Sequence, residues 1–190
     1  SDRIEILKTI QKGLAANPST FFLYATSHGA SPLPKDANSD DIKCYPYAPA
    51  LILDNGQNEC DSLNNLTPNA IATVVPEDNQ SKKIMVFQSC YSGGFISDTN
   101  NAKNFPSALA RKLNITLLTA SRSDSTSFGC GSGDVATFYG TSFSKALMSD
   151  KGTIESIDWL AVDKETKDFV RHFERKMRIR DNSAPQYFTR

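Results

Sequence analysis

The chain alternates between amphipathic segments and short apolar segments, which predicts helices alternating with strands. Residues 3–15 place Ile and Leu side chains on one stripe at helical spacing. The runs 20–26, 84–87 and 115–119 are short and largely apolar, as strands buried on both faces are. Further helices are predicted at 68–75, 105–113, 137–148 and 156–178. This alternation favours one α/β layer domain over residues 1–190.

The segment that begins at Ser156 is the longest predicted helix. The Ser156 hydroxyl suits an N-cap, and His172 lies among basic residues of this amphipathic helix, which predicts a structural role for it. Helical spacing assigns the core contacts to five apolar residues: Ile157, Leu160, Phe169, Phe173 and Met177. Two segments outside the helices, 49–53 and 183–188, are expected to be extended, the first as an edge strand or one arm of a hairpin.

Two of the predicted strands end close to a side chain that can take part in nucleophilic catalysis. The first is followed by His28 and Gly29, and the second by Cys90 and then Ser92-Gly93-Gly94. In a parallel sheet, the carboxyl ends of the strands frame the binding crevice. A thiol needs a base, because the thiolate is the attacking species. We therefore expect Cys90 and His28 to face each other across this edge, with glycines that let the backbone turn sharply.

Each half of this pair also has an ordinary structural interpretation. A single cysteine after a buried strand is most often a packed core residue, and a single histidine near a turn is usually a surface or satisfied core residue. The occurrence of both before glycines, at two strand ends, favours a catalytic dyad. In the loop 122–134, a predicted pocket wall, Asp124 and Asp134 are interpreted as turn residues, with substrate binding or proton transfer as the alternative.

Other kinds of site fit the sequence less well. Gly131-Ser132-Gly133 lacks the spacing of a serine-nucleophile elbow, and the neighbouring glycines do not give a dinucleotide-binding pattern. The 21 basic and 21 acidic residues balance, so nothing indicates nucleic acid as a partner. No apolar run approaches the roughly 20 residues that span a bilayer, so no membrane contact is expected from these residues. We expect no metal and no other cofactor, since the chain has two distant histidines and no cysteine pair at zinc-ligand spacing.

The remaining cysteines are interpreted separately from Cys90. Cys44 and Cys60 lie in loop-like sequence and can pair in an oxidising compartment, but the sequence does not supply the geometry that a disulfide requires, so free thiols are favoured. Cys130 is interpreted as a small buried residue.

The residues at the two strand ends resemble a known family. Ser27-His28-Gly29 and Ser89-Cys90-Tyr91-Ser92-Gly93-Gly94-Phe95 are similar to motifs of the caspase-haemoglobinase clan of cysteine peptidases. Within that clan the resemblance is to the legumain-type group, family C13, and to its bacterial members. Similar stretches follow in the same order along nearly the whole chain: Leu118-Thr119-Ala120-Ser121, Ser127-Phe128-Gly129-Cys130, Thr137-Phe138-Tyr139-Gly140 and Ser183-Ala184-Pro185-Gln186.

The resemblance implies a caspase-like three-layer sandwich with a mostly parallel central sheet, and a cysteine endopeptidase acting on peptides or proteins. Cys90 would be the nucleophile that forms a thioacyl-enzyme, and His28 the general base and acid. The backbone N–H groups of Gly29 and Cys90 would stabilise the oxyanion. No metal is implied, and an exported protein, periplasmic, secreted or envelope-associated, is favoured. The residues expected to contact substrate are Gln88, Ser121, Ser127 and Thr141.

The sequence departs from the family pattern at three points. Legumains carry a glutamate before the nucleophile where this chain has Gln88, and a second pocket acid aligns near the uncharged Thr141. Cleavage after Asn is therefore not carried over. Family members also have strands and helices before the segment 3–15, so either this chain begins inside the family domain or residues outside it complete the sheet.

Two alternative functions stay open from the sequence, as does the oligomeric state. A transamidase or peptide ligase would use the same acyl-enzyme path, with an amine in place of water. A non-catalytic interaction domain would keep the fold without the activity.

Overall fold

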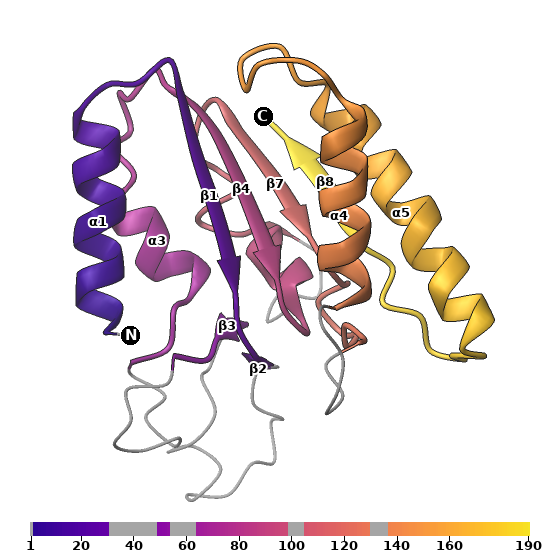
Figure 1. Cartoon of the computed structure of the whole chain (residues 1–190). Coiled ribbons are helices and arrows are strands. Elements are labelled where there is room, and N and C mark those ends of the chain that lie inside the picture. Colours follow the sequence, from indigo (N-terminus) through magenta and orange to yellow (C-terminus); the bar gives the residue numbers. More distant parts are fainter. Residues whose placement is uncertain (1, 31–48, 54–63, 99–104, 130–136) are drawn as a thin grey trace, which may run out of the picture.

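A mixed sheet lies between two layers of helices (Figure 1). The computed structural model describes residues 2–30, 49–53, 64–98, 105–129 and 137–190. The strands of the sheet, in spatial order, are β1 (Thr20–Thr26), β4 (Lys82–Gln88), β7 (Ile115–Thr119) and β8 (Gln186–Thr189). The first three are parallel and β8 is antiparallel to β7. This arrangement confirms the expected α/β class with a mostly parallel sheet.

Helices cover both faces of the sheet. One layer contains α1 (Arg3–Ala15) and α3 (Pro68–Val74), and the other contains α4 (Phe138–Ser149) and α5 (Trp159–Lys176). Short elements sit at the edge where the parallel strands end: β2 (Gly29–Ala30) pairs with β3 (Ala50–Leu51), and the 3-10 helix η2 (Ser92–Phe95) is followed by the pair β5 (Ser97–Asp98) and β6 (Phe105–Pro106).

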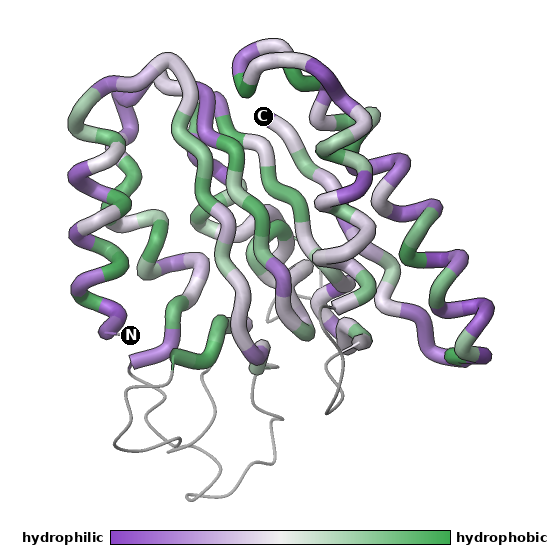
Figure 2. The backbone as a smooth tube through the Cα atoms, in the orientation of Figure 1, coloured by the Kyte–Doolittle hydropathy of each residue, from purple (hydrophilic) through white to green (hydrophobic). Residues whose placement is uncertain are grey.

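The central strand β4 holds the two layers together. Its residues Ile84 to Phe87 are fully buried, and successive side chains point to opposite faces. Met85 and Phe87 pack with α1 and α3, whereas Ile84 and Val86 pack with α4 and α5. Figure 2 shows this as an apolar band through the middle of the sheet. An apolar run of this kind forms a strand because both faces are covered.

The helix starts follow from capping residues in the sequence. The Thr67 hydroxyl accepts a hydrogen bond from the N–H of Ala70 at 3.1 Å, with Pro68 at the first helical position of α3. The Thr137 hydroxyl accepts from the N–H of Gly140 at 2.8 Å, which begins α4. These contacts confirm the predicted helices at 68–75 and 137–148, and α1 matches the segment 3–15.

The prediction for α5 was wrong at its start and along its buried face. The cap is Asp158, not Ser156, and Leu160 and Met177 are 59% and 62% exposed. Three polar side chains take core positions instead, because each has a local partner: Asp163 with Lys167, Thr166 with the carbonyl of Val162, and Glu174 with Ser183. The spacing of apolar residues alone therefore assigned two exposed residues, Leu160 and Met177, to the buried face. Ile157, Phe169 and Phe173 are partly buried, and His172 is exposed.

Two further expectations differ from the structure. The segment 105–113 is not a helix: Phe105 and Pro106 pair as a strand, and a single turn follows, in which the Ser107 hydroxyl accepts from the N–H of Ala110 at 3.0 Å. Strand β1 was expected to be buried on both faces, but it lies at the edge of the sheet and its residues are half-buried or exposed.

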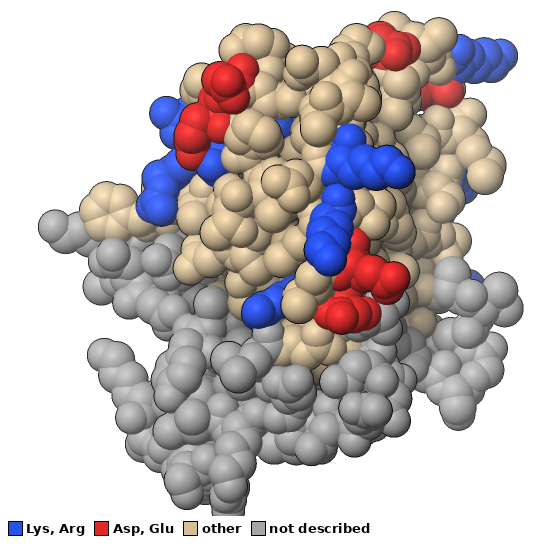
Figure 3. Space-filling view, turned by 90° about the vertical axis from the view of Figure 1, so that its left-hand side faces the viewer, with Lys and Arg blue, Asp and Glu red and all other residues tan. Residues whose placement is uncertain are grey.

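The face of the molecule formed over α1 carries basic and acidic side chains close together (Figure 3). Within the described residues, no helix has the length and apolar character that crossing a membrane requires.

A pair of methionine variants tests the packing of β4. Met85 is fully buried, so Met85→Ala should lower the free energy of unfolding by about 2–5 kcal/mol through the cavity it leaves. Met148 is 82% exposed, and Met148→Ala should change it by less than about 0.5 kcal/mol. The midpoint of urea unfolding measures both. Equal losses in the two variants would contradict the arrangement of the core.

Candidate active site

The candidate site lies at the carboxyl edge of the sheet, where β1 and β4 end side by side. The strands pair in register up to Thr26 and Gln88. His28 and Cys90 each follow two residues later, so the register brings them to the same level. Both residues line one cleft of about 260 Å³. Its other lining residues are Thr26, Ser27, Gln88, Ser89, Ser127 and Thr137.

The backbone of His28 is held between β4 and the segment after β3. The N–H of Ile52 donates to the carbonyl of His28 at 2.9 Å, and the Ser27 hydroxyl donates to the carbonyl of Ile52. On the other side, the N–H of Ser27 donates to the carbonyl of Gln88 at 3.4 Å. These contacts fix the main chain while the His28 side chain is exposed to solvent.

Gly29 brings the two loops into contact. A β-carbon at this position would overlap the carbonyl oxygen of Cys90 and lie 2.7 Å from its carbonyl carbon and 3.0 Å from its nitrogen. Only glycine therefore allows the chain after His28 to pass this close to Cys90. Leu51, opposite Gly29 in β3, exchanges both of its backbone hydrogen bonds with Leu66, at 3.0 and 2.9 Å. The N–H of Gly29 is accordingly not used in pairing with β3.

Cys90 is half-buried and its thiol is free. The N–H of Ser127 donates to Cys90 Sγ at 3.3 Å, and the N–H of Tyr91 donates to the carbonyl of Ser125 at 2.9 Å. The loop after β7 thus runs alongside the nucleophile candidate. Tyr91 has φ 58°, a left-handed conformation that costs a non-glycine residue about 1–2 kcal/mol.

The glycines after Cys90 do not supply the sharp turn that the sequence suggested. That turn is at Tyr91, whereas Gly93 and Gly94 are buried within η2 and do not have positive φ. Their role is close packing. A β-carbon on Gly93 would lie 2.5 Å from the nitrogen of Ser123, and one on Gly94 would overlap the ring of Pro49.

The four residues expected to contact substrate divide into three places. Gln88 lines the Cys90 cleft and also a neighbouring cavity of about 600 Å³, which Thr141 lines as well. Ser127 lines the cleft only. Ser121 lines neither cavity: its side chain is fully buried beneath the Cys90 loop, so the expectation of a substrate contact does not fit its position.

Gln88 is oriented by a residue that the sequence did not single out. The Tyr24 hydroxyl, on β1, donates a hydrogen bond to Gln88 Oε1. Partial burial raises the pKa of Tyr24 from 10.0 to about 12, so the hydroxyl keeps its proton, and can donate it in a hydrogen bond, even above pH 10. The amide N–H₂ of Gln88 is then the group left to face a ligand.

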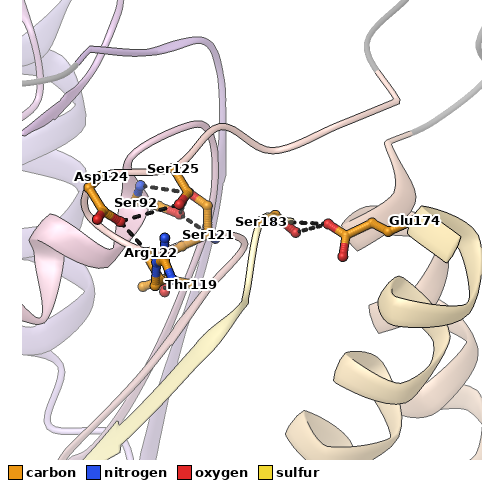
Figure 4. Close-up of polar contacts among 8 residues, drawn as sticks. All are labelled: Ser92, Thr119, Ser121, Arg122, Asp124, Ser125, Glu174 and Ser183. Carbon is orange, nitrogen blue, oxygen red and sulfur yellow. Dashed lines mark hydrogen bonds and ion pairs between the residues drawn. The ribbon is translucent and has the colours of Figure 1, made fainter. Parts of the chain in front are cut away.

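The described part of the loop after β7 is anchored to α5 (Figure 4). The Arg122 guanidinium forms an ion pair with Asp124 at 2.9 Å. The backbone N–H of Arg122 donates to the carbonyl of Ser183 at 2.8 Å. Ser183 in turn donates from its N–H and its hydroxyl to Glu174, at 2.7 and 2.5 Å. The hydrogen bond from Arg122 lowers the pKa of Asp124, whose carboxylate also accepts from the Ser125 hydroxyl at 3.2 Å within the same loop.

Several expectations lie outside the described residues. These are the roles of Cys44, Cys60, Cys130 and Asp134. Within the described residues, no group of three or more His, Cys, Asp or Glu side chains is placed to hold a metal ion.

Solved structures share this fold. Caspase-1 from Spodoptera frugiperda matches with a TM-score of 0.59 at 12% identity, over 100% of this chain and 68% of that one. Protein GSU0716 from Geobacter sulfurreducens matches with a TM-score of 0.55 at 15% identity, over 100% of this chain and 73% of that one. At these identities the likeness shows the fold alone, which is caspase-like.

The fold therefore places the chain in the caspase-like class of α/β proteins. The chain belongs to the peptidase C13 family, whose sequence profile matches residues 6–177. No curated protein gives a significant match. Family and fold together support a function of the cysteine-peptidase type.

The raised pKa of Tyr24 gives a prediction about stability at alkaline pH. Below pH 10 the hydroxyl is protonated in both states, but above it the unfolded state ionises first, so the free energy of unfolding falls as pH rises toward 12. Tyr24→Phe should remove this contribution, and urea unfolding of both proteins from about pH 9 to pH 11 measures it. If the difference between the two proteins is the same at every pH, the hydroxyl is not held in its neutral form.

Proposed function

We propose that this chain hydrolyses peptide bonds, with Cys90 as nucleophile and His28 as general base and acid. The observation that carries the proposal is that His28 and Cys90 line one cleft, each two residues beyond the last pair of the β1–β4 register, Thr26 and Gln88. Membership of the peptidase C13 family supports a peptide or protein as the substrate. Two contacts with the backbone of Ser127 support the position of the sulfur at the cleft: the N–H of Ser127 donates to Cys90 Sγ at 3.3 Å, and the thiol donates to the carbonyl of Ser127 at 3.6 Å.

Acylation begins when His28 takes the thiol proton and Sγ of Cys90 attacks the peptide carbonyl carbon. The carbonyl oxygen becomes an oxyanion. His28 then gives its proton to the leaving nitrogen, the C–N bond breaks, and the amine departs from a thioester on Cys90. In deacylation, His28 takes a proton from water, whose oxygen attacks the thioester. The C–S bond breaks, the acid product leaves, and the thiol recovers its proton.

Two backbone N–H groups are candidates for stabilising the oxyanion. The Gly29 N–H does not pair with β3, and the N–H of Cys90 makes no hydrogen bond to any described residue. The position of a β-carbon on Gly29 is only 3.0 Å from the nitrogen of Cys90, so the two loops meet at this point. Removing one donor of this kind typically costs about 10²–10³ in kcat.

Selective alkylation tests the dyad without knowledge of a substrate. An ordinary thiol is almost wholly protonated at mildly acidic pH, whereas a thiol paired with an imidazolium reacts as thiolate. Iodoacetamide should therefore modify Cys90 at least about tenfold faster than the other three cysteines, as measured by mass spectrometry of peptides after short exposures.

The chain supplies a matched control for this experiment, because it has two histidines. His28→Ala should remove the selective reaction, while His172→Ala, on the exposed side of α5, should leave it intact. Equal rates at all four cysteines of the unmodified protein would contradict the dyad.

Cleavage of a pooled peptide library tests the activity itself. The unmodified protein should cleave peptides in the pool, and Cys90→Ala should not. His28→Ala should lower the rate by about 10²–10⁴, the range that general acid–base catalysis supplies. Mass spectrometry of the products gives the residue before the cleaved bond and separates hydrolysis from transfer to an added amine. An equally active Cys90→Ala protein would falsify the proposal.

A further inference from the structure

We propose that Ser92 and Ser121 act together as positioning residues that aim the N–H of Cys90 at the developing oxyanion. This inference rests on the proposed function, because it assigns the oxyanion donor of that reaction. Neither side chain reaches the cleft: Ser92 is 1% exposed and Ser121 is 0% exposed. Both hydroxyls instead contact the peptide group that joins Ser89 to Cys90.

The two hydroxyls hold the carbonyl oxygen of that peptide group. Ser92 Oγ donates to the carbonyl of Ser89 at 2.9 Å, and Ser121 Oγ donates to the same oxygen at 3.2 Å. In a planar trans peptide the C=O and the following N–H point in opposite directions. The described residues contain no cis peptide bond. Fixing the oxygen of Ser89 on the buried side therefore fixes the N–H of Cys90 on the other side.

The two serines also hold each other. The N–H of Ser92 donates to Ser121 Oγ at 3.3 Å, and the N–H of Ser121 donates to Ser92 Oγ at 3.2 Å. Each hydroxyl thus accepts one hydrogen bond from a backbone N–H and lies within reach of the carbonyl of Ser89, and the two hydroxyl oxygens lie 3.4 Å apart. Figure 4 shows the two side chains next to each other, one from the start of η2 and one just after β7.

The hydrogen bonds between Ser92 and Ser121 connect the Cys90 loop to the most buried part of the sheet. The N–H of Ala120, the residue before Ser121, donates to the carbonyl of Phe87 at 3.0 Å, and Phe87 is fully buried in β4. The Cys90 loop therefore begins at β4 and is also held to the end of β7 by the hydrogen bonds between Ser92 and Ser121. Hydrogen bonds to a carbonyl also polarise its peptide group, which makes the N–H of Cys90 a stronger donor.

The double variant Ser92→Ala/Ser121→Ala tests the inference. Without the hydroxyls the N–H donor is present but less well directed, so kcat for one fluorogenic peptide, made from a sequence that the library experiment finds cleaved, should fall by about tenfold to hundredfold, with KM changed little. Alkylation of Cys90 by iodoacetamide builds no oxyanion, so its rate should stay within about twofold. This split distinguishes positioning from a general displacement of the loop.

Ser107→Ala is the matched control. Ser107 is also a buried serine, 4% exposed, and its hydroxyl also donates to a backbone carbonyl, that of Phe95 at 2.5 Å. Ser107 does not line the Cys90 cleft and makes no hydrogen bond to Ser89, so the loss of its hydroxyl should lower the free energy of unfolding and leave kcat unchanged. If the double variant does not fold, Ser92→Ala and Ser121→Ala separately leave one donor each and should each lower kcat by about threefold to tenfold.

Three results would overturn the inference. The first is an unchanged kcat in the serine variants, relative to Ser107→Ala. The second is a loss of alkylation rate that equals the loss of kcat, which means that the sulfur itself has moved. In both cases the unmodified protein is active and only the role of the serines is lost. The third is an unmodified protein that neither cleaves peptides nor shows selective alkylation, which removes the proposed function and this inference with it.

Discussion

The in-register parallel pairing of β1 with β4 is the constraint on which the candidate site depends. A shift of one residue would send every side chain of a strand to the opposite face and would set His28 opposite a neighbour of Cys90. Burial on both faces of β4 opposes such a shift, because Met85 and Phe87 would exchange layers with Ile84 and Val86. The placement of His28 and Cys90 at one cleft is thus a consequence of core packing.

The two members of the proposed dyad follow strands that differ in burial. Cys90 follows the central, fully buried strand, and its loop is tied to β7 and to the segment that contains Ser127. His28 follows the edge strand, and its side chain is exposed even though its backbone is fixed. A nucleophile must be held still relative to its oxyanion donors, whereas a proton shuttle must meet both the leaving group and water. The asymmetry of the sheet suits this division of roles.

The sequence correctly predicted those features of the fold that depend on local residue patterns. Apolar runs gave β4 and β7, capping residues gave the starts of α3 and α4, and the positions of His28 and Cys90 after their strands predicted the shared cleft that both line. It failed where tertiary contacts decide. Leu160 is exposed because paired polar residues take the buried face of α5, and the segment 105–113 is not a helix, since its first residues pair with β5. The edge position of β1 likewise depends on strand order, which no local pattern encodes.

The glycines after Cys90 are needed for close packing and not for the sharp turn that the sequence suggested. They suggested freedom to turn, yet the left-handed residue is Tyr91, and the glycines serve because a side chain would strike a neighbouring segment. The same holds for Gly29, where any side chain would overlap the backbone of Cys90. Glycine at these positions sets the distance between loops. Because Gly93 has no side chain, the segment after Cys90 approaches the segment after β7 closely enough for Ser92 and Ser121 to form hydrogen bonds with each other.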